Sequence, residues 1–458
     1  MEVNSIRLAY DGGTLLVAGA AAADLAALPG CRLDPRSGSC RAEARHYRAL
    51  VEYLRKQQIP YTDEARAYQP TPWSLRTSRD PFPHQTEALE AWWQKGGRGV
   101  VVLPTGSGKT HLAVMAIAHT SRPALVVTPT NDLLNQWYDE LIMAFEVPIG
   151  LLGGGYYDLQ PLTVTTYDSA YIHLERWGNR FGLIVFDECH HLPGPTYATT
   201  AVGSLAPYRL GLTATPERAD GQEVLLADLI GPIVYRREIK QLAGEFLAEY
   251  RIERRYVELS REEQDLYEAA RNHYRRFVEE RGISMGGPNG WQRFLRETYR
   301  SPEGRSAFLA YREQKRLSMA APAKLHFLER LLEHHQGDRV LIFTFDNATV
   351  YQIARRFLVP AITHQTKTRE RRDILLRFHS GEYPILVTSQ VLNEGVNVPA
   401  ANVGIILSGT GSVREHVQRL GRLLRKQGEK QALLYEVVTR GTAEEFTSER
   451  RRQHHAYR

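Results

Sequence analysis

Two series of short apolar segments constrain the fold of this chain more than any other feature. In each series, strands rich in Val, Ile and Leu alternate with helical stretches, a pattern typical of parallel sheets covered by helices on both faces. The first series comprises 99–103, 124–128, 162–166, 183–186 and 209–213, and the second comprises 340–344, 361–364, 385–388, 403–407 and 433–438. The expected fold class is therefore α/β, with two parallel-sheet domains that look like a duplicated architecture.

The remaining segments predict two smaller parts. Alternating runs at 6–10 and 14–17 flank Asp11-Gly12-Gly13 and predict a hairpin, followed by a helical stretch at 42–56. The Pro-containing segment 69–72 is interpreted as a linker. A chain of 458 residues is expected to form two to four domains. The predicted domains are a small N-terminal α+β domain at 1–72, a first sheet domain at 78–238, a basic helical segment at 250–320 and a second sheet domain at 322–458.

The basic charge of the chain is concentrated in one segment. Residues 271–316 contain eleven Lys or Arg and five Asp or Glu, an excess equal to the net charge of +6. Its aromatics, interleaved with the basic residues, are Tyr274, Phe277, Trp291, Phe294, Tyr299, Phe308 and Tyr311. This mixture suits phosphate contacts and base stacking, although the aromatics alternatively form a small core of their own.

Composition excludes several classes of protein. No run of 18 apolar residues occurs, so we expect no membrane span. Three cysteines do not make a disulfide framework, which favours a reducing cytoplasm.

A glycine-containing loop after the strand at 99–103 predicts a phosphate site. Residues 104–110, Pro-Thr-Gly-Ser-Gly-Lys-Thr, lead into a helix whose N-terminus favours anions. Lys109 is expected to reach the β and γ phosphates of ATP, and the Thr110 hydroxyl to bind Mg²⁺. The loop residues expected to hold phosphate are Gly106, Ser107 and Gly108. Because Leu103 replaces the first glycine of the strict pattern, a chance glycine-rich turn stays open as an alternative for the loop by itself.

Two adjacent carboxylates predict the hydrolytic centre. Asp187 and Glu188 end the apolar strand at 183–186, where Asp187 is expected to bind the magnesium and Glu188 to orient the attacking water. A zinc cluster of Cys189, His190 and His191 is disfavoured, because adjacent residues at a strand end point apart and no second Cys/His pair is near. Cys189 is interpreted as inert filling.

Other segments extend the predicted site. The hydroxyls of Thr213 and Thr215 are suited to transmit the state of the γ-phosphate to neighbouring groups. The side-chain amide of Gln85 offers a donor and an acceptor for hydrogen bonds to the edge of adenine. In the second half, Arg422 and Arg425 are expected to act as arginine fingers across a cleft, with Gln418 positioning water or the γ-phosphate.

In this order, the segments resemble the motifs of superfamily 2 helicases, and the chain is similar to the XPB helicases, in particular the short archaeal type. The segments that carry the resemblance are 103–111, 161–171, 187–193, 389–399, 408–425 and 435–441. The resemblance implies two RecA-like domains, ATP and Mg²⁺ as cofactors, and Gly395 and Asn397 in motif V at the nucleotide. It further implies 3′→5′ translocation on DNA, linked to duplex opening in nucleotide excision repair or transcription.

The resemblance also assigns the accessory parts and the partners. The N-terminal domain resembles a damage-recognition domain, and the basic segment resembles a thumb. A partner nuclease is implied, and we expect a monomer in the cytoplasm, associated with the nucleoid in a prokaryote. Three positions depart from the family pattern: Ala219 replaces the acid of an Arg-Glu-Asp motif, Phe82 stands where Arg is frequent, and Asn397 stands where Asp is common.

DNA contacts are expected at strand ends, in the Arg218–Asp220 loop and on the basic segment. The strand-end candidates are Thr130, Gly153-Gly154, Thr165, Thr166, Thr344, His364, Thr388 and Gln390. The loop candidates are Arg218 and Asp220, and those of the basic segment are Arg275, Arg276, Arg293, Arg296 and Arg300, with Trp291 or Phe294 as stacking residues. Such groups grip the backbone without reading sequence.

Two alternative functions stay open at this point. A weak DNA-stimulated ATPase that positions a nuclease is motivated by Ala219 in the loop expected to open DNA. An RNA helicase of the DEAD type is disfavoured, because Asp187-Glu188-Cys189-His190 departs from Asp-Glu-Ala-Asp.

Overall fold

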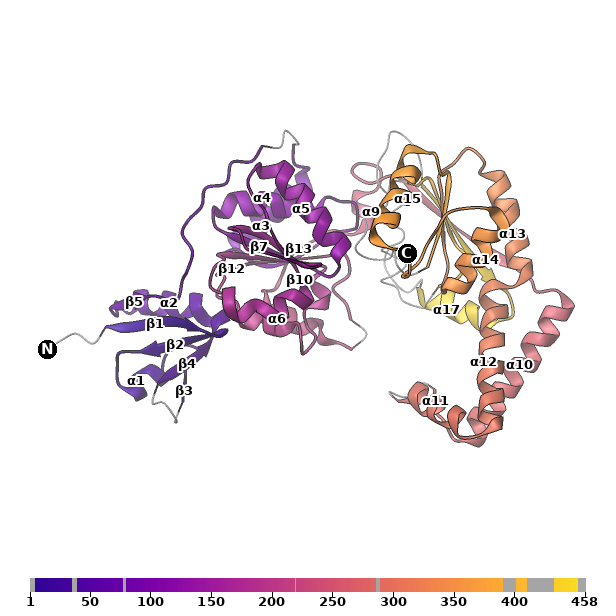
Figure 1. Ribbon diagram of the computed structural model, residues 1–458, viewed down its shortest axis with the longest axis horizontal. Coiled ribbons are helices and arrows are strands. Elements are labelled where there is room, and N and C mark those ends of the chain that lie inside the picture. The colour runs from indigo at the N-terminus through magenta and orange to yellow at the C-terminus, as the bar shows by residue number, and fades with distance from the viewer. Residues whose placement is uncertain are drawn as a thin grey trace. The chain divides into compact units, whose positions relative to one another are not determined.

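The computed structural model describes residues 5–34, 39–76, 80–218, 220–285, 289–389, 401–409 and 432–451 (Figure 1). The chain forms two compact units, the first built from residues up to Leu242 and the second from Ala243 onward. Each unit is described by itself.

A small N-terminal sheet confirms the predicted hairpin. Its strands are β1 (Ile6–Asp11), β2 (Thr14–Ala18), β3 (Arg32–Leu33), β4 (Cys40–Glu43) and β5 (Tyr61–Asp63), in the order β3-β4-β2-β1-β5. Its helices are α1 (Ala22–Ala26) and α2 (Tyr47–Lys56). The helix predicted from residue 42 begins later, because residues 40–43 pair with β2.

The first large sheet carries the strands expected from the first apolar series. In sequence order they are β6 (Arg98–Val102), β7 (Ala124–Thr128), β8 (Gly150–Gly153), β9 (Tyr156–Asp158), β10 (Leu162–Thr166), β11 (Leu183–Asp187), β12 (Tyr208–Thr213) and β13 (Ile233–Arg236). The order across the sheet is β13-β6-β12-β11-β7-β10-β8-β9, parallel except for β9. The carboxyl ends of β6, β12 and β11 therefore lie next to one another at one edge.

Helices cover both faces of this sheet, with α4 and α5 on one side and α6 on the other (Figure 1). The helices of this part are α3 (Pro83–Gln94), α4 (Lys109–Thr120), α5 (Asn131–Phe145), α6 (Tyr167–Trp177), α7 (Ala198–Val202), α8 (Leu226–Leu229) and α9 (Ile239–Leu242). Coverage on both faces explains why β7, β10 and β11 are buried at every position.

The second large sheet contains one strand that the apolar pattern did not predict. Its strands are β14 (Tyr250–Val257), β15 (Val340–Phe343), β16 (Ala361–Ile362), β17 (Ile385–Thr388), β18 (Val403–Ile406) and β19 (Ala432–Thr439), in the order β14-β19-β18-β15-β17-β16. The start of the supposed helical segment at 250 is thus wrong, since β14 pairs with β19 along its whole length. Its charged, partly exposed sequence, Tyr-Arg-Ile-Glu-Arg-Arg-Tyr-Val, is that of an edge strand rather than of a buried one.

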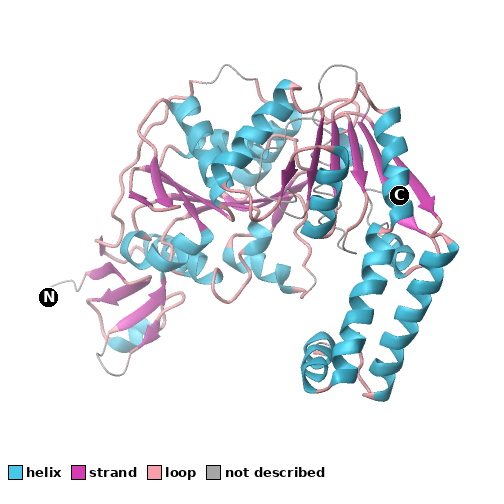
Figure 2. Ribbon diagram, turned by 45° about the vertical axis from the view of Figure 1, so that its right-hand side comes forward, coloured by secondary structure: helices cyan, strands magenta, loops and turns pink. Residues whose placement is uncertain are grey.

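The thumb, defined here as helices α10 (Arg261–Glu280), α11 (Gly290–Arg300) and α12 (Pro302–Ala320), forms a long helical pair with a short helix at its tip (Figure 2). The other helices of the second unit are α13 (Pro322–His334), α14 (Asn347–Phe357), α15 (Thr368–Ser380) and α17 (Ala443–Arg451). Polar contacts fix the base of the thumb. The Tyr267 hydroxyl accepts a bond from Ala443 N, and the Thr439 hydroxyl donates to Ser318 O at 2.6 Å.

The N-terminal domain is bonded to the first sheet domain rather than tethered by a free linker. The Tyr10 hydroxyl donates to the carbonyl oxygens of Gly203 at 3.0 Å and Leu174 at 3.2 Å. Within the supposed linker, Thr71 N donates to Ser121 O, and Trp73 Nε1 just beyond it donates to Arg122 O. The segment has no helix or strand because its bonds run to the neighbouring domain.

Tyr10→Phe is expected to lower the free energy of unfolding of the N-terminal unit by about 1 kcal/mol, because two part-buried carbonyl oxygens lose their donor. Burial already raises the pKa of Tyr10 to about 12, so its hydroxyl stays protonated near neutral pH. Calorimetry of the full chain should show a midpoint lower by a few degrees. Tyr53→Phe, at an exposed position on α2, is the matched control; equal effects of both changes would contradict the assignment.

Candidate nucleotide site and nucleic-acid interface

The loop between β6 and α4 has the geometry of a phosphate cradle. Gly106 and Gly108 both have φ of +88°, a backbone conformation that glycine adopts without strain. The Ser107 hydroxyl donates to Pro104 O at 2.7 Å and thereby closes the loop. Lys109 begins the 12-residue helix α4, and its ammonium donates to Leu103 O at 3.1 Å. A helix N-terminus and a lysine thus face the same loop, as anion binding requires.

Gln85 supports this loop from behind. Its side-chain Nε2 donates to the carbonyl oxygens of Ser107 and Gly108, and its Oε1 accepts a bond from Phe82 N. A Cβ at position 108 would collide with the Gln85 amide, so any other residue there would displace this side chain as well as strain the backbone. The predicted contact of Gln85 with adenine stays a prediction, since its polar atoms bond to the protein.

Asp187 lies at the end of β11 in a buried environment. Its two oxygens accept bonds from Trp137 Nε1 at 2.8 Å and from Glu188 N at 3.0 Å. Burial and the neighbouring Glu188 carboxylate raise the pKa of Asp187 to about 6, opposed by the Trp137 bond and by Lys109. A buried carboxylate of this kind suits a divalent cation, which would favour its ionised form. Trp137 is a positioning residue that the sequence reasoning missed.

Glu188 is held in an uncommon backbone conformation, with φ of +45°. Its Oε2 lies 3.4 Å from Nδ1 of His190 and 3.5 Å from the Thr213 hydroxyl. The same His190 nitrogen lies 3.0 Å from that hydroxyl. These contacts join the carboxylates to the end of β12, as the predicted relay through Thr213 requires.

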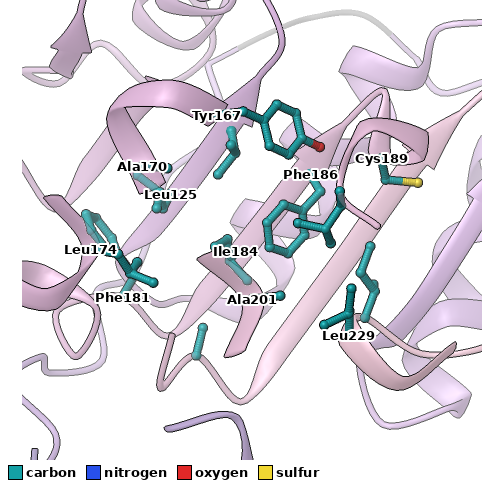
Figure 3. Close-up of a cluster of buried hydrophobic side chains, with 14 of the residues drawn as sticks. Leu125, Tyr167, Ala170, Leu174, Phe181, Ile184, Phe186, Cys189, Ala201 and Leu229 are labelled. Atoms are coloured by element: carbon teal, nitrogen blue, oxygen red, sulfur yellow. The ribbon is translucent and has the colours of Figure 1, made fainter. Parts of the chain in front are cut away.

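The residues beside the carboxylates belong to the core. Figure 3 shows Cys189 with Phe186, Tyr167 and other apolar side chains packed on β11. Burial raises the pKa of the Cys189 thiol well above its usual value, which agrees with an inert filling role. In the described part of the chain, no group of three His, Cys, Asp or Glu side chains could hold a metal ion.

The residues at this edge fit ATP with Mg²⁺. The hydroxyls of Thr105, in the loop, and of Thr215, after β12, are buried and have no hydrogen-bond partner among the residues described. Buried hydroxyls without partners are rare, and polar ligand atoms would satisfy them. Lys109 and Thr110 on α4 and Asp187 on β11 supply the ammonium, hydroxyl and carboxylate expected for such a ligand.

The threonines predicted to bind DNA divide into two groups. Thr130 and Thr166 cap α5 and α6, accepting bonds from Leu133 N and Ser169 N, and lie at helix N-termini that suit phosphates. Thr165, Thr344 and Thr388 are fully buried. Their hydroxyls donate to Leu152 O, Asp346 O and Ser389 O, respectively. DNA contacts of these three residues stay a prediction, since their hydroxyls are buried and bond to the protein.

Arg218 and Asp220 bind each other. Nε and Nη2 of Arg218 donate to the two Asp220 oxygens at 2.8 and 2.6 Å. The Arg218 contact lowers the pKa of Asp220 to about 2. Neither the pairing nor the third bond of Arg218, to His190 O, was expected from the sequence.

In the thumb, most aromatic residues pack in a core and the basic residues are exposed. Phe277, Ile283, Phe294 and Ala307 form a small buried core, against which Tyr274, Phe308 and Tyr311 pack. The interpretation of Phe294 as a stacking residue is thus wrong, whereas Trp291 and Tyr299 are exposed. The arginines predicted to contact phosphates, Arg275, Arg276, Arg293, Arg296 and Arg300, are all exposed.

Sequence comparisons identify related families for three segments of the chain. Residues 78–218 match the type III restriction enzyme res subunit family, 323–427 the helicase conserved C-terminal domain, and 8–65 the damage recognition domain of xeroderma pigmentosum group B helicase. A protein named DNA 3′-5′ translocase XPB2, from Sulfurisphaera tokodaii, is 38% identical over 93% of this chain and 96% of its own length. This chain belongs to the XPB helicase family. The resemblance found in the sequence is thereby confirmed.

Further relatives extend the XPB family assignment. A protein named DNA 3′-5′ helicase XPB from Kineococcus radiotolerans is 32% identical over 84% of this chain, which covers 64% of that relative. The crystal structure of the Pyrococcus furiosus Hef helicase domain aligns with 80% of this chain and 97% of its own, with a TM-score of 0.55 and 18% identity. The match supports the predicted fold class, two RecA-like domains.

Several of the predicted site residues lie outside the described residues. They are Gln390, Gly395, Asn397, Gln418, Arg422 and Arg425, and also Ala219 of the altered loop. Among the helices described, none is long and apolar enough to cross a membrane.

Proposed function

We propose that this chain is an ATP-driven DNA translocase of 3′→5′ polarity that opens duplex DNA in repair or transcription. One observation carries the proposal: the Lys109 loop follows β6, the Asp187–Glu188 pair ends β11, and β12 lies between these strands with its Thr213 in contact with Glu188 and His190. The relatives named as DNA 3′-5′ translocases and helicases support the substrate and the polarity.

In the proposed mechanism, this chain's own groups bind and orient the nucleotide. Lys109 and the amides of Gly106, Ser107 and Gly108 hold the phosphates, and Thr110 with Asp187 holds Mg²⁺, which neutralises phosphate charge when bound. Glu188, fixed by His190 and Thr213, orients the attacking water. Low exposure of both carboxylates strengthens these electrostatic interactions.

The second half of the chain completes the proposed site. Arg422 and Arg425 stabilise the charge that develops on the γ-phosphate, Gln418 positions the water, and Gly395 and Asn397 contact the nucleotide. The support is their order in motifs V and VI of the family. Residues from both halves then act only when the two sheet domains close on ATP, and closure advances the DNA. A partner nuclease and a monomeric state are proposed by resemblance alone.

Rates of ATP hydrolysis with matched DNA and RNA, and unwinding of duplexes with 3′ or 5′ tails, test this function. We expect DNA to stimulate hydrolysis more than RNA at equal salt, and only the 3′-tailed duplex to be opened. Equal stimulation by RNA would favour an RNA helicase. Stimulation of ATP hydrolysis by DNA without strand displacement would favour the scaffold function, in which this chain positions a partner nuclease on the DNA.

A further inference from the structure

Arg218 is fixed at three points in the loop that follows β12. Its guanidinium holds Asp220 through two parallel bonds, and its Nη1 donates to His190 O at 2.6 Å. Its own backbone N donates to a Glu223 oxygen at 3.2 Å. Bidentate pairing with a carboxylate sets the orientation of a guanidinium as well as its position. The side chain is only 21% exposed, against 44% for Asp220, so it lies beneath its partner.

His190 connects this arginine to the ATP site. Its ring contacts Glu188 and Thr213, and its carbonyl oxygen accepts the Arg218 bond. The residue is fully buried within the single turn at Cys189–His191, so its ring has little room to move independently of its backbone. A shift of the loop that holds Arg218 therefore displaces the group that fixes Glu188.

We propose that Arg218 is a positioning residue that couples the loop carrying Asp220 to Glu188 through the His190 carbonyl, and is not itself a phosphate ligand. The inference rests on the proposed function, since it assigns Glu188 to ATP hydrolysis. DNA that engages this loop then alters the orientation of Glu188 and so the rate at which ATP is hydrolysed.

The pairing argues against a direct phosphate contact. Asp220 neutralises the guanidinium and places its own negative charge on the more exposed side. A phosphate approaching Arg218 would have to displace a carboxylate that is already bidentate. If Arg218 did bind phosphate, removing Asp220 would strengthen DNA binding; under the coupling role, the same change weakens stimulation of the ATPase.

The test compares Arg218→Ala, Arg218→Lys and Asp220→Ala with the unaltered full chain, by ATP hydrolysis against DNA concentration at several salt concentrations. For Arg218→Ala we expect turnover at saturating DNA to fall roughly tenfold, the effect of losing a charge-assisted hydrogen bond. The DNA concentration for half-maximal stimulation and its salt dependence should not change. Asp220→Ala should lower turnover in the same way, and Arg218→Lys should retain an intermediate rate.

Two results would overturn the inference. One is a weaker DNA affinity of Arg218→Ala, with a salt slope reduced by about one and normal turnover at saturation, which marks a phosphate ligand. The other is tighter DNA binding by Asp220→Ala at normal turnover. Arg377→Ala is the control, since Arg377 also holds two carboxylates, of Asp373 and Glu382, on the second unit. An unaltered chain that hydrolyses no ATP would instead contradict the proposed function.

Discussion

Lys109→Ala is expected to reduce DNA-stimulated ATP hydrolysis by roughly 10²–10³-fold or more, the effect of removing one preorganised charge-stabilising group from a reaction centre. The ammonium lies against the loop carbonyl oxygens of Leu103 and Pro104 at the start of α4. In its absence the phosphates lose the only lysine of that loop. Single-turnover hydrolysis with saturating ATP and DNA measures the effect.

Three further variants separate ATP binding from ATP hydrolysis. Glu188→Gln and Arg425→Ala should bind a fluorescent ATP analogue as the unaltered chain does and yet hydrolyse ATP at a small fraction of its rate. Lys95→Ala, an exposed lysine at the end of α3, is the matched control and should change neither quantity. Turnover retained by Lys109→Ala or Glu188→Gln would refute the assignment of the first half-site; turnover retained by Arg425→Ala would refute the second.

Replacing Arg275, Arg276, Arg293 and Arg296 together by Gln is expected to produce the second largest effect, on DNA binding. All four side chains are exposed on the thumb, whereas the residues of its aromatic core are buried. Each phosphate contact contributes about 0.7–0.9 to the slope of log affinity against log salt, so four contacts contribute roughly 3. The affinity for DNA at low salt should fall by orders of magnitude, and the slope of log affinity against log salt should become less steep.

Fluorescence anisotropy with a labelled junction DNA over a salt series gives both quantities. A matched variant replaces Arg7, Arg251, Arg377 and Arg440, four arginines elsewhere in the chain whose side chains are at least 43% exposed, and should bind DNA with the original slope. An unaltered slope in the thumb variant would show that its positive charge is solvated and makes no phosphate contact. Thermal unfolding checks that the thumb core is intact in both.

Most of the fold could be predicted because buried strands require apolar residues, which can be recognised in the sequence. Strands such as β7 and β11, covered on both faces, consist of apolar residues, and these mark them in the sequence. β14 was not predicted, because it is an edge strand. Backbone hydrogen bonds to β19 hold it, and these do not require apolar side chains. The bonds that dock residues 69–76 on the first sheet domain are likewise made largely by the backbone.

The candidate site was predictable in its residue types but not in its connections. Phosphate and magnesium chemistry requires a lysine, a hydroxyl and paired carboxylates, and these stand at fixed spacing from strand ends. The Trp137 bond to Asp187 and the Arg218 bond to His190 O join residues far apart in sequence. Motif spacing does not predict such contacts. The burial of Thr344 and Thr388 could not be predicted either, because residues near a strand end alternate in direction.

The pairing of β14 with β19 sets the order in which the protein can fold during synthesis. β14 leaves the ribosome early, at residues 250–257, but its partner is made only at 432–439. The first sheet, in contrast, uses strands that all lie between 98 and 236. The N-terminal unit can therefore fold while the rest is being translated, in keeping with domains that fold in order of synthesis. The second sheet and the base of the thumb must wait until residues 432–443 have been made.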